Sequence, residues 1–101
     1  MCLNIEKKQS DAQTVVALGG RLDTATAPEL ENQLKELFPT TSDLVLDFAA
    51  LDYISSAGLR VLLVAQKQMN KTGGKMTLIN VNDVVQEVLE MTGFVDILNI
   101  C

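Results

Sequence analysis

The sequence feature that most constrains the fold is the run from Leu44 to Phe48, in which four apolar side chains surround a single acid, Asp47. Strands with one solvent-exposed face alternate apolar and polar residues, whereas the strands of parallel sheets that are covered on both faces are almost continuously apolar. The run therefore predicts a central strand that is buried on both faces. Asp47, its one polar position, needs either a bonding partner or a function.

Before this strand, the pattern predicts two strands and a helix. Val15 to Leu18 is predicted to form a strand that ends at Gly19-Gly20, with Leu3 to Glu6 as its partner in a hairpin. Thr26 to Glu29 has the Thr-x-x-Glu form of a capping box, in which both side chains bond free N–H groups at a helix start. The helix that follows buries a stripe of leucines at Leu30, Leu34 and Leu37.

After the central strand, helices and strands alternate. The pattern predicts a helix over 57–70 with Gly73-Gly74 as its stop, then a strand over 75–79, then a helix capped by Asn82 and ended by Gly93. Residues 94–100 are compatible with a helix, a strand or a docked tail. The apolar stripes of all three helices are assigned to the core, and three methionines are predicted to fill gaps in it: Met69, Met76 and Met91.

This order of elements predicts an α/β sandwich with a mixed central sheet of about four to five strands and three to four helices. In such sheets, ligands and partners meet the protein outside the carboxyl ends of the parallel strands. That edge is predicted to be formed by residues 47–56 and by the loop after Gly20.

The composition narrows the class of function. The chain has 101 residues, which fits one domain over residues 1–101, and its net charge of -5 favours neither a nucleic acid nor an anionic membrane as partner. Its apolar stretches are too short to span a bilayer and the N-terminus lacks a signal-peptide pattern, so a cytoplasmic location is predicted.

The chemistry of the side chains disfavours catalysis. No histidine is present, and the two cysteines, Cys2 and Cys101, lie at opposite ends of the chain, where we interpret them as free thiols. A metal site, a cofactor and a histidine-dependent triad are therefore not expected. A serine nucleophile would need a base such as Lys67, Lys71 or Lys75, none of which has a known catalytic spacing from Ser56.

The segment Leu51-Asp52-Tyr53-Ile54-Ser55-Ser56-Ala57-Gly58-Leu59 closely resembles the signature loop of STAS-domain proteins, with Ser56 at the position of the second serine. Three further segments, Gly20-Arg21-Leu22-Asp23, Leu46-Asp47-Phe48 and Met91-Thr92-Gly93-Phe94, resemble the family in the same order along the chain. The resemblance implies a STAS domain of the anti-sigma factor antagonist type, which is a binding protein and not an enzyme.

The same resemblance implies a phosphorylation switch. The unphosphorylated protein would bind an anti-sigma factor that is also a serine kinase, phosphorylation of Ser56 would release it, and a PP2C-type phosphatase would reverse the modification. Ser55 is the second choice of acceptor, because many phosphorylated antagonists have aspartate at that position. The residues implied to support the phosphosite or bind the partner are Asp23, Asp47, Ser55, Ala57 and Gly58.

Elementary chemistry is compatible with this switch, because a serine at a helix start lies beside unpaired N–H groups that tolerate a phosphate. The alternatives are that Ser55 or Ser56 is only a helix cap, that Gly58 serves close packing, and that Asp23 and Asp47 are structural. The alternative function is a STAS accessory subunit of a membrane transport system, such as a lipid-transport ABC system, without a phosphorylation cycle.

Overall fold

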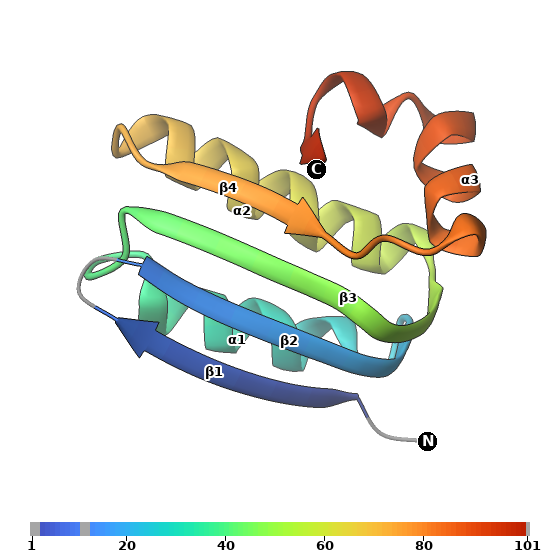
Figure 1. The fold of residues 1–101 in the computed structure, drawn as a ribbon, viewed down its shortest axis with the longest axis horizontal. Coiled ribbons are helices and arrows are strands. Elements are labelled where there is room, and N and C mark those ends of the chain that lie inside the picture. The colour runs from blue at the N-terminus through green and yellow to red at the C-terminus, as the bar shows by residue number, and fades with distance from the viewer. Residues whose placement is uncertain (1–2, 11–12, 101) are drawn as a thin grey trace.

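Within the described part of the chain, five strands form one mixed sheet in the order β1-β2-β3-β4-β5, which is also their order along the chain (Figure 1). The computed structural model describes residues 3–10 and 13–100. β1 and β2 form an antiparallel hairpin, and β2, β3, β4 and β5 are parallel. The mixed α/β sandwich predicted from the sequence is therefore confirmed, while Cys2 and Cys101 lie outside the described residues.

The elements alternate as the sequence pattern indicates. Their bounds are β1 Asn4–Ser10, β2 Gln13–Leu22, α1 Ala27–Leu37, β3 Asp43–Ile54, α2 Ser56–Lys71, β4 Lys75–Ile79, α3 Asp83–Thr92, a 3-10 turn at Phe94–Asp96, and β5 Asn99–Ile100.

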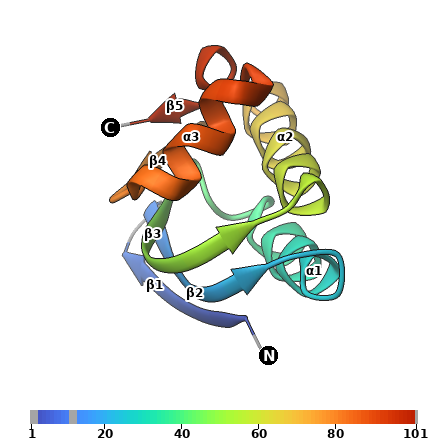
Figure 2. The ribbon, with the colours of Figure 1, turned by 90° about the vertical axis from the view of Figure 1, so that its right-hand side faces the viewer.

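Two helices, α1 and α2, lie side by side on one face of the sheet (Figure 2). Between them and the sheet lies the core, where alternate β3 residues Leu44, Leu46 and Phe48 are fully buried. Val45 and Asp47 point to the other face and are only half-buried. The prediction that this strand is buried on both faces was thus wrong, because α1 and α2 both cover the same face.

The predicted end of β2 at Gly19-Gly20 was also wrong. Gly20 adopts a positive φ of 93°, which glycine tolerates, and β2 continues through Leu22. On β3, two bulges place extra residues opposite β2: the register shifts between Ala17 and Gly19 and again between Gly20 and Arg21. With these bulges, β2 and β3 stay paired as far as Leu22 and Ile54, directly before Ser55 and Ser56.

The helix α3 lies beyond the end of β4 (Figure 1). The Asn82 carboxamide oxygen accepts the Val85 N–H at 2.9 Å, and Gly93 ends the helix with a φ of 79°, so both predicted caps are confirmed. Its apolar residues are not all core, however, since Val84 is 60% exposed and Met91 is 79% exposed. The gap-filling role is confirmed for the buried Met69 and Met76 and is wrong for Met91.

No helix within residues 3–10 and 13–100 has the length and apolar character needed to cross a membrane.

Candidate functional site

The candidate site lies at the junction of β3 and α2, where a single residue, Ser55, joins strand to helix. The Ser55 N–H donates to the Leu22 carbonyl at 2.9 Å, which fastens the junction to the end of β2. The Ser55 hydroxyl oxygen accepts the Gly58 N–H at 3.4 Å, a long bond in the geometry of an N-cap. Ser55 is therefore the residue that caps α2.

Ser56 is the first residue of α2 and is exposed. Within the described part of the chain its hydroxyl has no hydrogen-bond partner in the protein, in contrast to the Ser55 hydroxyl. The helix dipole and the unpaired N–H groups of the first turn make this position favourable for an added negative charge. The two neighbouring serines therefore differ in role, and Ser56 is the one whose hydroxyl is available to a partner.

Gly58 lets the start of α2 pack directly on the ends of β2 and β3. A Cβ at this position would lie 2.7 Å from Leu22 Cγ and 2.9 Å from Ile54 Cγ1, closer than nonbonded carbon atoms approach. A packing requirement thus accounts for the glycine.

Asp23 organises the turn between β2 and α1. Its carboxylate Oδ1 accepts the backbone N–H groups of Ala25 at 3.0 Å and Thr26 at 3.1 Å, and its Oδ2 lies 3.7 Å from Arg21 Nε. Partial desolvation alone would raise the pKa of Asp23, but the hydrogen bonds and the Arg21 charge outweigh it and hold the pKa below its ordinary value of 3.8.

This arrangement corrects the predicted capping box. The Thr26 hydroxyl accepts the Asp23 N–H at 2.9 Å and donates to the Arg21 carbonyl at 2.9 Å, so it bonds the turn before the helix instead of the helix start. Because Asp23 directly follows Leu22, whose carbonyl holds Ser55, the turn and the serine junction are neighbours. Asp23 therefore lies at the candidate site and has a structural task there.

Asp47 lies earlier on β3, where it has structural contacts, and its expected position near Ser56 stays a prediction. Its Oδ1 accepts Asn80 Nδ2 and the Ala49 N–H, each at 3.0 Å, so it ties β3 to the residue after β4. From Asp47, β3 continues through Ile54 before α2 begins, and seven residues of strand, at about 3.3 Å each, make roughly 20 Å of chain. Asp52, which is exposed near the end of β3, is the closer acid along this strand.

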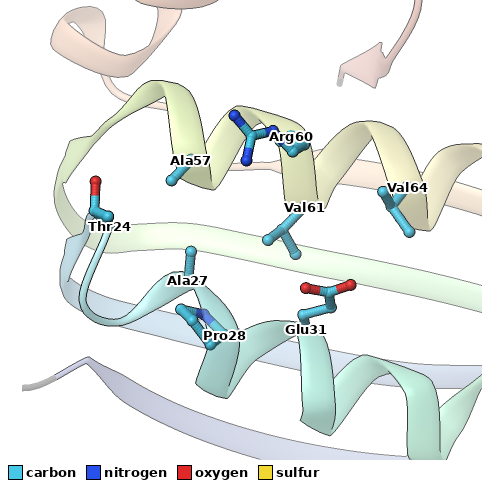
Figure 3. Close-up of a pocket in the computed structure, with 8 residues that line it drawn as sticks. All are labelled: Thr24, Ala27, Pro28, Glu31, Ala57, Arg60, Val61 and Val64. Carbon is cyan, nitrogen blue, oxygen red and sulfur yellow. The ribbon is translucent and has the colours of Figure 1, made fainter.

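A groove between α1 and α2 opens beside the serine junction (Figure 3). Its volume is about 260 Å³, and its floor includes the apolar side chains of Ala27, Ala57 and Val61. Glu31 of α1 and Arg60 of α2 also line it. Of these residues, only Ala57 was predicted from the sequence to belong to the site. The groove itself could not be predicted, because it depends on two helices lying side by side. The sequence does show that Arg60 follows Ser56 by four residues, which is the signal that could have identified it.

The fold and the serine junction define a class of small α/β domain in which an exposed serine begins a helix at the end of a central strand. The family model for the STAS domain matches residues 4–101. The chain belongs to the STAS domain family.

Similar proteins agree with this assignment. BtrV of Bordetella bronchiseptica is 39% identical over 88 residues, which cover 86% of this chain and 76% of BtrV. The anti-sigma-B factor antagonist of Bacillus subtilis is 30% identical over 100 residues, covering 99% of this chain and 92% of that protein.

Solved structures share the fold at lower identity. The Bacillus anti-sigma factor antagonist SpoIIAA superposes with a TM-score of 0.77 in both its unphosphorylated and its phosphorylated form, covering 99% of this chain and 87% and 91% of the two SpoIIAA chains. The identities are 15% and 16%. The likeness therefore concerns the fold alone.

Proposed function

We propose that this protein is an anti-sigma factor antagonist controlled by phosphorylation of Ser56. In the unphosphorylated state it binds an anti-sigma factor that is also a serine kinase, and so frees a sigma factor. The kinase transfers the γ-phosphoryl group of ATP to the Ser56 oxygen, ADP leaves, and the modified antagonist is released. A PP2C-type phosphatase hydrolyses the phosphoserine and restores binding. This cycle of binding, phosphorylation and dephosphorylation takes place in the cytoplasm, where ATP is available. The antagonist is the substrate of the kinase and the phosphatase and is not itself an enzyme.

The observation that carries the proposal is the exposed Ser56 hydroxyl at the start of α2, next to a serine that is already used as the cap. Membership in the STAS family and likeness to the anti-sigma-B factor antagonist of Bacillus subtilis support it. Ser56 is therefore the proposed acceptor, with Ser55 and Asp23 shaping the junction around it.

The chemistry of the position explains how phosphorylation would end binding. A phosphate adds about 1.5 to 2 negative charges at neutral pH, beside a helix N-terminus that can accommodate them without rearrangement of the fold. A partner fitted to the neutral surface would have to bury this charge unpaired, at about 2 to 5 kcal/mol. The expected loss of affinity is roughly thirtyfold to several thousandfold.

Affinity capture from the native cell, followed by calorimetry with the captured partner, tests the proposal. We expect an anti-sigma factor kinase to be captured, to phosphorylate Ser56, and to bind Ser56→Ala constitutively. Ser55→Ala is the matched control and should still be phosphorylated and released. Modification confined to Ser55, unchanged affinity after full phosphorylation, or capture of a transporter ATPase without any phosphorylation would contradict the proposal.

A further inference from the structure

Arg60 lies one helical turn after Ser56, on the same face of α2. Residues at i and i+4 are neighbours on a helix surface, and helical side chains lean toward the N-terminus, which directs the long arginine side chain back to the first turn. Both residues are exposed. In Figure 3 the Arg60 guanidinium extends toward the end of α2 that carries Ala57, the residue after Ser56.

Arg60 is available to pair with a new charge. Among the described residues it has no ion pair, whereas Arg21 is held by Asp23 and lies 4.2 Å from the centre of the Tyr53 ring. The next cation along α2, Lys67, is eleven residues from Ser56, and at about 1.5 Å per residue it is roughly 16 Å along the helix axis. Arg60 is therefore the α2 cation within reach of Ser56.

The other charged side chains around this end of α2 are mainly acidic. Glu31 lies across the groove on α1, where Lys35 is its ion-pair partner at 3.5 Å, Asp23 lies in the turn before α1, and Asp52 is near the end of β3. A phosphate dianion at Ser56 is repelled by these carboxylates. An acid placed N-terminal to a base at i and i+4 is the favourable order on a helix, so Arg60 is suited to offset that repulsion.

We infer that Arg60 is the countercharge of phosphorylated Ser56, an inference that rests on the proposed phosphorylation of that serine. Because Arg60 also lines the groove between α1 and α2, the modification changes the surface twice. It adds a dianion at the helix start and it engages the arginine of the groove. A partner that contacts Arg60 in the unphosphorylated state thus loses that contact at the moment the phosphate appears.

The test needs no kinase. The full chain is produced with phosphoserine installed at position 56 by genetic-code expansion, and the second ionisation of the phosphate is followed by ³¹P NMR. In the parent chain we expect its pKa to be about 0.2 to 0.4 unit lower than in an Arg60→Gln variant, and this difference should shrink in 1 M salt. Arg60→Lys should retain part of the difference. Lys67→Gln, a distant charge on the same helix, should leave the phosphate pKa unchanged.

Circular dichroism confirms that each variant is folded before its titration is compared. A phosphate pKa that is the same in the parent and in Arg60→Gln overturns the inference, and so does an equal shift caused by Lys67→Gln. Either result leaves the proposed function standing, since that proposal fails on a different observation, the absence of Ser56 phosphorylation by the captured kinase.

Discussion

Replacing Gly58 by alanine should destabilise the protein through the contact between α2 and the ends of β2 and β3. The new methyl group would lie 2.7 Å from Leu22 Cγ and 2.9 Å from Ile54 Cγ1, and both of these residues are buried. Overpacking of this kind costs about 1 to 3 kcal/mol, while alanine in a helix regains about 0.5 to 1 kcal/mol relative to glycine. We expect a net loss of about 1 kcal/mol, which lowers the melting temperature by roughly 4 to 8 °C for a domain of this size.

Urea unfolding followed by circular dichroism measures the loss, and a double-mutant cycle with Leu22→Ala identifies its cause. Leu22→Ala alone costs about 2 to 5 kcal/mol, but it removes the two Leu22 atoms that the new methyl group would meet and leaves only the Ile54 contact, so Gly58→Ala should cost less in that background. Ser56→Ala, at an exposed neighbouring position, should change stability by less than about 0.5 kcal/mol. A Gly58→Ala protein as stable as the parent, or costs that simply add in the double mutant, would refute the proposed clash.

Three further predictions concern the polar contacts of the site and of α3. Asn82→Ala removes the cap of α3 and the bond from Asn82 Nδ2 to the Leu51 carbonyl, and should cost about 1 to 3 kcal/mol in urea unfolding, with Asn82→Asp intermediate because it keeps the cap. Ser55→Ala should lower stability by about 0.5 to 1 kcal/mol, measured in the same way, since its cap bond is long. The pKa of Asp23 is lowered in the folded protein, so the ionised carboxylate stabilises the fold above pH 3.8, and this stabilisation is lost as the pH falls through the folded-state pKa. The Asp23→Asn variant should lack this part of the pH dependence when unfolding is measured against falling pH.

The features that could be predicted from the sequence depend on local signals. β4 has the predicted bounds, and α3 begins and ends at the predicted Asn82 and Gly93, because capping and chain reversal are decided by a few adjacent residues. Periodicity likewise identified the buried leucines of α1. It could not show that Val84 and Met91 remain exposed, because that depends on how far α3 extends past the sheet.

The candidate site was predicted only in part, for a geometric reason. The serine junction is a contiguous segment, so its pattern identified Ser55, Ser56 and Gly58 together. The position of Asp47 depends instead on the length of β3, which the two bulges allow to continue beyond the pairing with β4. The groove that contains Arg60 depends on the contact between two helices, which a linear pattern does not describe.

The sheet order has a consequence for how the chain acquires its fold. Since β1, β2, β3, β4 and β5 are neighbours in the same order in which they occur along the chain, each strand can add to an edge that the preceding residues have already formed. Among the described strands, none has to be inserted between two others that are already paired. The chain therefore avoids the slow pairing of strands that are far apart in sequence. During synthesis, the domain can therefore grow from its N-terminal hairpin in the direction in which the ribosome releases it.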